Sequence, residues 1–219
     1  NIYELIEAQD GAIYASGDHY APGPQWPGAV FKTTDGGVIW TRTGDLDSTI
    51  HVWTVFQAVN GTIYAGADCH HVFWTTDGGA NWNWTGPVPG FVYEFVQDYE
   101  GALYAGVEDT TAGSVLKSTD AGTTWVKMVE WPESESVQSL LRAFDGSIYA
   151  GTFGFWESGE VYRSTDAGTT WVQTGDLEGV EWVMDLLQAS DGTIYAGTRF
   201  NGDVFRCCPP QGDLVSSVY

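Results

Sequence analysis

Short apolar and aromatic segments alternate with glycine-rich turns along the whole chain. The segments are rich in β-branched and aromatic residues, as in 161–164 and 183–187. Such residues suit a half-buried pleated surface, and frequent turn signals favour short antiparallel strands. The apolar runs all fall short of the about 20 residues that a membrane-spanning helix needs. We therefore expect an all-β protein without membrane insertion.

Two sequence repeats divide the chain into units of nearly constant length. The pattern S/T-x-D-x-G-x-x-W covers residues 33–40, 75–82, 118–125 and 164–171, and its aspartates are 42, 43 and 46 residues apart. A second pattern, Gly-x-hydrophobic-Tyr-Ala, covers residues 11–15, 61–65, 101–105, 146–150 and 192–196. A period of this size is typical of repeat architectures, whose units bury their apolar faces against one another.

Each unit is predicted to hold four strands, a to d. A glycine turn joins strands a and b, a loop of variable length joins b and c, and the S/T-x-D-x-G-x-x-W turn joins c and d. We expect one domain over residues 1–219, with units at approximately 1–50, 51–90, 91–135, 136–181 and 182–219. The fifth unit has a degenerate turn at 207–213, and its strand d is expected at 214–219.

One four-stranded sheet cannot cover both of its faces, but five sheets stacked radially can, as in a β-propeller. We favour a ring closed by packing of the fifth blade on the first. The alternative is that these five blades belong to a longer ring.

The S/T-x-D-x-G-x-x-W turns resemble the Asp-box, or BNR, repeats of sialidases, sortilin-type receptors, xyloglucanase-type glycoside hydrolases and photosystem-assembly propellers. The resemblance covers essentially the whole chain. It implies a five-bladed β-propeller of four-stranded antiparallel blades with Asp-box c–d turns, and no single function, because those proteins do unrelated things. Sialidase activity is disfavoured, because that family needs an arginine triad with a Phe-Arg-Ile-Pro type motif, and the five arginines lie in no such motif.

The conspicuous residues of these turns are expected to be structural. The aspartate can accept hydrogen bonds from turn amides, and the tryptophan can pack between sheets. Calcium binding is the less favoured alternative, since one carboxylate per turn is a poor ligand set. The residues concerned are Asp35, Trp40, Asp77, Trp82, Asp120, Trp125, Asp166 and Trp171.

The net charge of −21, from 29 acidic and 8 basic residues, excludes nucleic acid and anionic membranes as natural partners. The first residue is Asn1 rather than Met, so we expect a processed protein in an extracellular, periplasmic or cell-surface location. Three cysteines, Cys69, Cys207 and Cys208, are compatible with one disulfide and one free thiol, and their pairing stays open.

The b–c loops vary in length while the turns on the other face are short and uniform, which indicates that the variable-loop face binds ligands. Aromatic rings on or near this face suit sugar stacking or a protein hot spot. Packing back onto the loops is the alternative. The candidates are Tyr20, Trp26, Trp131, Phe153, Phe155, Trp156 and Trp182.

All four histidines, His19, His51, His70 and His71, fall in loops of the first two units. Together with nearby carboxylates and Cys69 they could hold zinc or copper. Their spacing matches no recognised metal motif, so solvated loop histidines are the alternative and no cofactor is favoured.

Alignment of the innermost strands places Glu4, Thr54, Glu94, Ser139 and Asp185 at one equivalent position. A second polar ring follows three residues later, and one of the two rings should line the central channel. Three carboxylates, Glu4, Glu94 and Asp185, could supply the acid and the base or nucleophile of glycoside hydrolysis. A hydrated polar channel is the alternative.

These patterns together favour a secreted, non-catalytic binding or structural propeller. Its ligand is expected to be a protein partner, including a second copy of itself, or a polysaccharide. The contact is expected around Trp26, Trp131, Phe155 and Trp156. The alternative function is a glycoside hydrolase that uses the channel carboxylates.

Overall fold

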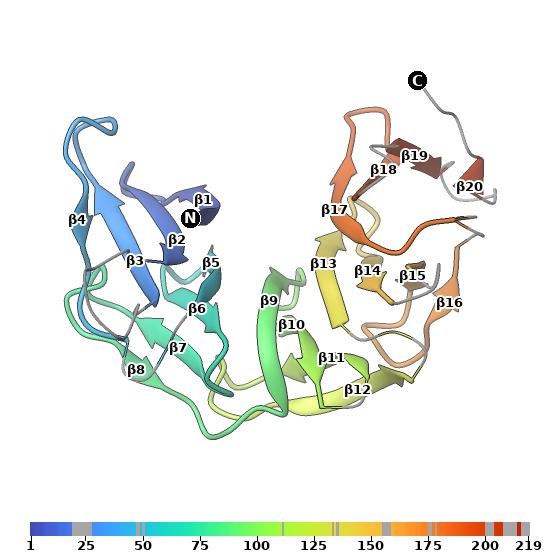
Figure 1. Ribbon diagram of the computed structural model, residues 1–219, viewed down its shortest axis with the longest axis horizontal. Helices are drawn as coiled ribbons and strands as arrows, with labels where there is room; N and C mark the ends of the chain where they lie inside the picture. The colour runs from blue at the N-terminus through green and yellow to red at the C-terminus, as the bar shows by residue number, and fades with distance from the viewer. Residues whose placement is uncertain are drawn as a thin grey trace.

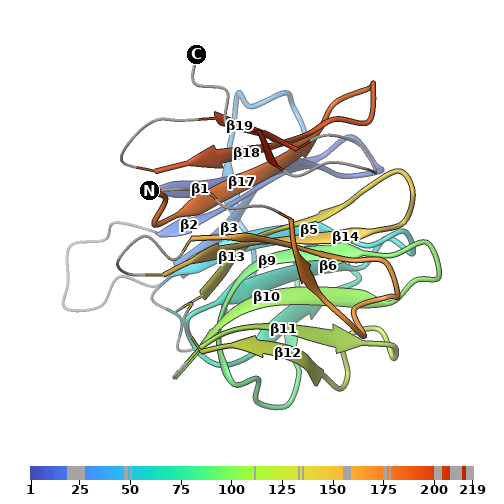
Figure 2. The same ribbon diagram turned by 90° about the vertical axis from the view of Figure 1, so that its right-hand side faces the viewer.

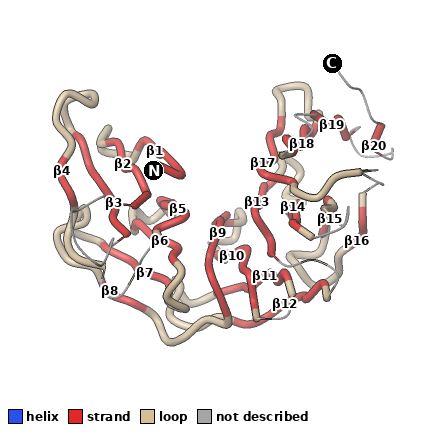
Figure 3. The backbone as a smooth tube through the Cα atoms, viewed as in Figure 1, coloured by secondary structure: helices blue, strands red, loops and turns tan. Residues whose placement is uncertain are grey.

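The computed structural model describes residues 1–18, 28–46, 49, 51–110, 112–132, 134, 136–154, 159–174, 177, 179–199, 204–207 and 214–215. Within these ranges the regular elements are all strands (Figure 3). The same residues contain no helix that is long and apolar enough to cross a membrane. The prediction of an all-β protein is confirmed.

The described strands form five antiparallel sheets, each built from four strands that are consecutive in sequence. The innermost strand of each sheet is β1 (Ile2–Glu7), β5 (Val52–Gln57), β9 (Gly90–Gln97), β13 (Ser136–Arg142) or β17 (Val183–Gln188). The second strands are β2 (Ile13–Asp18), β6 (Ile63–Ala67), β10 (Leu103–Asp109), β14 (Ile148–Phe153) and β18 (Ile194–Thr198). The third strands are β3 (Gly28–Thr33), β7 (Val72–Thr75), β11 (Gly113–Ser118), β15 (Val161–Ser164) and β19 (Val204–Cys207). The outer strands are β4 (Thr41–Arg42), β8 (Asn83–Trp84), β12 (Val126–Trp131), β16 (Val172–Gln173) and β20 (Leu214–Val215).

The five sheets stand as the blades of a propeller around a common centre (Figure 1). Neighbouring innermost strands contact one another, from β1 and β5 through to β13 and β17. Seen from the side, the strands run from one face of the assembly to the other (Figure 2). The second, third and fourth sheets along the arc therefore each have a neighbouring sheet on both faces.

The blades form an open arc, with β1 and β17 on its two arms (Figure 1). The expected packing of the fifth blade on the first is therefore wrong for the described residues. Exposure shows the same opening: Leu5 is 59% exposed, whereas its equivalents Val55 and Phe95 are 0% and 2% exposed. The first and fifth sheets therefore each have one face that no other described sheet covers.

The two sequence repeats meet across the blade interfaces. In the first three blades, the tyrosine of the second strand donates its hydroxyl hydrogen to a backbone carbonyl in the c–d turn of the next blade. These bonds join Tyr14 to Gly78 at 3.2 Å, Tyr64 to Ala121 at 3.0 Å and Tyr104 to Ala167 at 2.9 Å. The tyrosine repeat thus joins each of the first three blades to its successor, which is consistent with the shared period of the two patterns.

We expect Tyr64→Phe to lower the free energy of unfolding by about 0.5–1.5 kcal/mol, because the Ala121 carbonyl loses its buried donor. Urea unfolding measures the change. Tyr195→Phe is the matched control, since the described residues place no acceptor for the equivalent hydroxyl beyond the fifth sheet. An equal loss in both variants would contradict a role of the hydroxyl in joining blades.

Four c–d turns lie in the described residues, and each is closed by its own serine or threonine and aspartate. The Ser118 hydroxyl donates to Asp120 Oδ1 at 2.8 Å and accepts from the Gly122 amide at 2.9 Å, while Asp120 Oδ1 also accepts from the Thr124 amide. The other three turns repeat this arrangement around Asp35, Asp77 and Asp166. Hydrogen bonds from residue 124 lower the pKa of Asp120 to about 2. These aspartates thus satisfy backbone groups of their own turns.

The turn tryptophans differ in burial along the arc. Trp82 is 9% exposed and donates from Nε1 to Thr43 of the preceding blade, and Trp125 and Trp171 pack against apolar clusters. Trp40, in the first blade, is 41% exposed. The expectation that each turn tryptophan packs between sheets is wrong for Trp40, because the described residues place no sheet on that side.

Candidate functional site

Every innermost strand carries a register irregularity one residue before the equivalent polar position. In the third blade, Val92 and Glu94 pair with the consecutive residues Val107 and Gly106, which leaves Tyr93 as the extra residue. The other four strands have the same irregularity. A bulge of this kind re-aims a side chain. The extra residues are Tyr3, Trp53, Tyr93, Gln138 and Met184.

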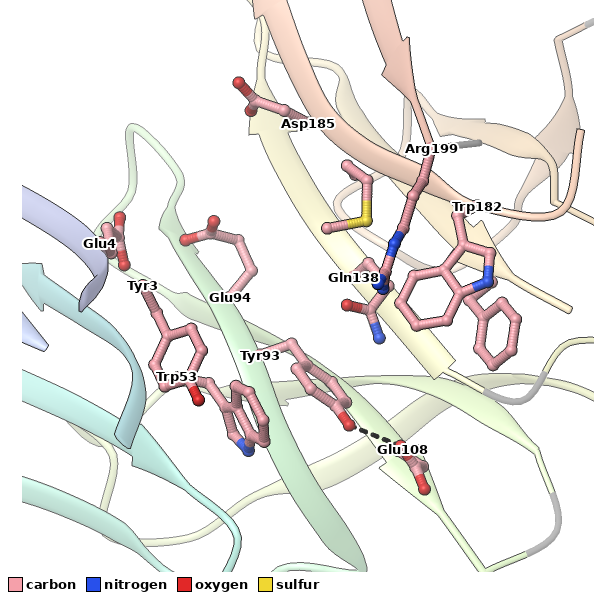
Figure 4. Close-up of a pocket in the computed structure, with 12 residues that line it drawn as sticks. Tyr3, Glu4, Trp53, Tyr93, Glu94, Glu108, Gln138, Trp182, Asp185 and Arg199 are labelled. Carbon is pink, nitrogen blue, oxygen red and sulfur yellow. Dashed lines mark hydrogen bonds between the residues drawn. The ribbon is translucent and has the colours of Figure 1, made fainter. Parts of the chain in front are cut away.

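These five side chains line a single cavity of about 620 Å³ at the centre of the arc (Figure 4). They lie near the starts of the innermost strands, and residues at the ends of second strands, such as Glu108 and Phe153, complete the lining. The cavity therefore opens on the variable-loop face. Its volume lies in the range of small-molecule sites, about 300–1,000 Å³.

One wall of the cavity is a row of aromatic rings. The ring of Trp53 lies between those of Tyr3 and Tyr93, with centroid distances of 4.6 and 5.4 Å (Figure 4). His51 stacks on Trp53 at 4.7 Å, and its Nδ1 lies 2.7 Å from Asp18 Oδ1. The Tyr3 hydroxyl also donates to Asp18, at 2.7 Å. These contacts hold the row in place from behind.

The opposite wall is built by Phe153 and Trp182. Their rings lie 4.0 Å apart, and a β-bridge joins their backbones. The guanidinium of Arg199 lies 4.7 Å from the ring centroid of Trp182 on the same side of the cavity (Figure 4). The cavity thus has aromatic surface on two sides.

Carboxylates of three blades lie between the walls. Glu4 Oε2 accepts hydrogen bonds from the Thr54 hydroxyl at 2.6 Å and the Val55 amide at 2.9 Å. Glu94 Oε1 accepts from the adjacent Phe95 amide at 2.9 Å, and its side chain reaches toward Glu4 (Figure 4). Asp185 stands on the other arm of the arc (Figure 4).

Burial and mutual repulsion govern the protonation of these carboxyls. Removal from water raises the pKa of Glu94 well above its usual value, and the negative charges of Glu4 and Asp185 raise it further. Burial likewise raises the pKa of Glu4, although its bonds to Thr54 and Val55 oppose the effect. Burial, reinforced by the neighbouring charges, therefore makes Glu94 hold its proton more tightly than an ordinary carboxyl does.

Because the folded state holds this proton more tightly than the unfolded chain, the contribution of Glu94 to native stability falls as pH rises above the ordinary carboxyl pKa of about 4.3. We expect Glu94→Gln to be more stable than the wild type at neutral pH. The difference should disappear in acid below that pKa, where both states are protonated. Thermal unfolding at the two pH values measures it, and each kcal/mol gained raises Tm by about 2–4 °C.

The control for this change is Glu100→Gln, which alters an exposed turn carboxylate outside the cavity. It should leave the pH dependence as it is. A Glu94→Gln protein less stable than the wild type at neutral pH would show that the Glu94 charge is stabilised rather than penalised.

Tyr93 and Glu108 form a half-buried hydrogen-bonded pair in the cavity. The Tyr93 hydroxyl donates to Glu108 Oε2 at 2.6 Å. Burial, followed by this carboxylate, raises the pKa of Tyr93. The Tyr93 ring therefore stays neutral and keeps a fixed orientation at the end of the aromatic row.

The histidines point to different partners. His51 pairs with Asp18, the His70 ring meets Phe91 at 5.7 Å, and His71 Nδ1 lies 3.2 Å from the Thr85 carbonyl oxygen. His19 lies outside the described residues. Over the part of the chain that is described, no group of three or more His, Cys, Asp or Glu side chains could hold a metal ion.

The cysteines show no shared site among the described side chains. Cys69 is a free, half-buried thiol packed against the apolar cluster between the first two sheets. Burial raises its pKa to about 11, so the thiol stays protonated at neutral pH. The side chain of Cys207 and all of Cys208 lie outside the described part of the chain.

The structure separates the aromatic candidates into three groups. Phe153 and Trp182 line the cavity. Trp131 is 7% exposed and stacks on Tyr162 at 4.2 Å inside an apolar cluster, so it packs within the protein. The remaining candidates lie outside the described residues: Tyr20, Trp26, Phe155 and Trp156.

Sequence reasoning placed Glu4, Glu94 and Asp185 at equivalent positions and missed the residues before them. The register puts those carboxylates opposite Ser16, Gly106 and Gly197 of their second strands, as the alignment requires. The bulged residues had a signal in the sequence, since each directly precedes the aligned polar position. A strict alternation of faces along the strand hides this signal.

Comparisons with known proteins agree on the propeller. A family model, the DUF6242 beta propeller domain, matches residues 92–215, which is more than half of the chain. No curated protein matches the sequence. Catalytically inactive virginiamycin B lyase from Staphylococcus aureus, solved with quinupristin, superposes with a TM-score of 0.77 at 12% identity, over 100% of this chain and 70% of the lyase chain.

Two further structures are similar. The GH74 xyloglucanase from Xanthomonas campestris has a TM-score of 0.75 at 16% identity, over 94% of this chain and 36% of that one. A protein of unknown function from Dyadobacter fermentans has a TM-score of 0.60 at 18% identity, over 93% of this chain and 76% of that one. At these identities the similarity concerns the fold alone.

Proposed function

Because this chain belongs to the family of the DUF6242 beta propeller domain, a fold compatible with many functions, we propose its function from the cavity itself: it binds carbohydrate without transforming it. The observation that carries the proposal is the pair of aromatic walls, Tyr3–Trp53–Tyr93 and Phe153–Trp182, with carboxylates between them. Pyranose rings present C–H faces that stack on aromatic rings, and their hydroxyls donate to carboxylates.

The setting of the cavity supports this proposal. It opens along the concave side of an arc, so an extended chain can enter without passing through a closed ring (Figure 1). The net charge of −21 disfavours nucleic acid as the ligand. An extracellular, periplasmic or cell-surface location is part of the proposal, since that is where polysaccharides are met.

The test is retention of the purified protein on a broad panel of polysaccharides, with released sugar recorded at the same time. Retention without release is the expected result. Absence of retention on every member would contradict the proposal. It would leave a protein partner, including a second copy of this chain, as the better explanation.

Glycoside hydrolysis is the second candidate, and the raised pKa of Glu94 favours it. Hydrolysis needs one protonated and one ionised carboxyl around the scissile bond, and Glu94 lies near Glu4 and Asp185. In this case sugar release is expected, and Glu94→Gln should abolish it while the fold persists. Turnover that survives Glu94→Gln would remove Glu94 as the acid.

A further inference from the structure

We propose that the ligand of this cavity is an amino sugar chain whose protonated primary amine lies between Glu4 and Glu94, against the Tyr3–Trp53–Tyr93 row. The inference rests on the proposed carbohydrate function and names the class of sugar. Two observations support the amino sugar proposal: the arrangement of aromatic rings in the cavity lining and the distribution of charged groups around it.

The charged groups of the cavity are unevenly placed. Its lining contains four carboxylates, Glu4, Glu94, Glu108 and Asp185, and one basic residue, Arg199. Arg199 lies over Trp182 on the opposite wall, away from Glu4 and Glu94 (Figure 4). The side with the aromatic row therefore offers two neighbouring carboxylates with no cation beside them among the lining residues.

The aromatic row adds a second attraction for a cation. The face of an indole or phenol ring carries negative charge, and a cation within about 6 Å of the centroid is stabilised by it. The protein already uses this contact on the other wall, where the Arg199 guanidinium lies 4.7 Å from the Trp182 centroid. In Figure 4 the Tyr3 ring is the part of the row that lies nearest to the Glu4 and Glu94 carboxyls, so an ammonium between them would have an aromatic ring on its other side.

A bound ammonium would also take the place of the proton that Glu94 holds in the empty cavity. Burial and the charges of Glu4 and Asp185 favour this proton. When an ammonium binds between Glu4 and Glu94, the proton leaves to solvent and both carboxylates accept charge-assisted hydrogen bonds. A neutral acetamido group at the same carbon has no charge and one N–H donor in place of three, so the two sugars should bind differently.

The experiment compares three oligosaccharides of equal length by calorimetry at about pH 6, below the ordinary pKa of an amine. They are the β-1,4-linked glucosamine tetramer, the same tetramer fully N-acetylated, and the galacturonic acid tetramer. We expect the free amine to bind about ten-fold or more tightly than its acetylated form, as for hydrogen bonds between charged groups. Added salt should weaken only the amine-bearing ligand.

Variants of the cavity test whether Glu4 and Glu94 cause the preference for the free amine. In the double variant Glu4→Gln, Glu94→Gln the preference for the free amine should fall to about one, because both carboxylates are gone. Glu100→Gln removes one exposed charge outside the cavity and should keep the preference. A preference that survives in the double variant would place the amine elsewhere and overturn the proposal.

The outcomes distinguish failure of the amino sugar proposal from failure of the proposed carbohydrate function. Equal binding of the amine and acetylated tetramers would overturn the amino sugar and keep the carbohydrate function. Tightest binding of galacturonic acid would also overturn it, with Arg199 as the anchor of an acidic sugar. Absence of binding by all three, together with no retention on the polysaccharide panel, would overturn the carbohydrate function itself.

Discussion

Gly106→Val is expected to lower the free energy of unfolding by about 3 kcal/mol or more, since overpacking of a rigid interior costs about 1–3 kcal/mol even when side chains can adjust. A Cβ at residue 106 would lie 2.8 Å from Val137 Cγ1 and 2.8 Å from the Val137 carbonyl oxygen. Val137 belongs to β13, the innermost strand of the next blade. Backbone there cannot move without disturbing the register that aims Gln138 into the cavity.

The fifth sheet supplies the matched control. Gly197 is the equivalent of Gly106, but the atom nearest to its added Cβ is the Asp185 carbonyl oxygen at 4.0 Å. Gly197→Val should therefore cost less than about 1 kcal/mol. Urea unfolding of both variants measures the difference, and 3 kcal/mol corresponds to a fall in Tm of about 6–12 °C. Similar losses at both sites would show that close approach of neighbouring blades does not explain these glycines.

Trp53→Ala is expected to weaken binding of the retained polysaccharide by about 10–100-fold. Trp53 lies at the centre of the aromatic row, and loss of a large buried apolar contact costs about 1.5–3 kcal/mol, where 1.4 kcal/mol is one factor of ten. Calorimetry with a soluble oligomer of the retained polysaccharide measures the affinity. Trp182→Ala on the opposite wall should give a loss of similar size.

Trp84→Ala is the control for both changes. Trp84 is 57% exposed on β8, an outer strand away from the cavity, so affinity should stay within about two-fold of the wild type. Thermal unfolding shows whether each variant keeps its fold. Affinity retained in both cavity variants would contradict the proposed site, and a loss in Trp84→Ala alone would move the site to the outer strands.

The turns and the repeat of strands could be predicted from sequence, because each depends on residues that lie close together in the chain. The c–d turns hold their own hydrogen bonds, within five residues from Ser118 to Gly122 in the third blade. The equivalence of Glu4, Glu94 and Asp185 follows from a period that the chain repeats almost without change. Four-stranded antiparallel sheets follow from the same period, since each unit folds on residues close in sequence.

The orientation of the site residues depended on pairing between strands, although their position before the aligned polar residues was visible in the sequence. A bulge adds one residue to one strand, and its effect on Tyr3, Trp53 and Tyr93 appears only in the pairing with the second strand. Trp131 is an aromatic residue of the kind that often binds ligands, but Tyr162 and the surrounding apolar cluster cover it. Neither fact can be read from the neighbours of these residues in sequence.

The sequence by itself determined the all-β class, the five four-stranded units, the turns that close them and the shared position of the channel carboxylates. The tertiary structure decided that the arc stays open, that bulged aromatic residues face the cavity, and that Phe153 and Trp182 form the wall opposite to them. The physical reason is the distance along the chain over which the relevant contacts extend. Turns and strands depend on contacts within one period, whereas the angle between sheets and the content of the cavity depend on packing summed over several blades.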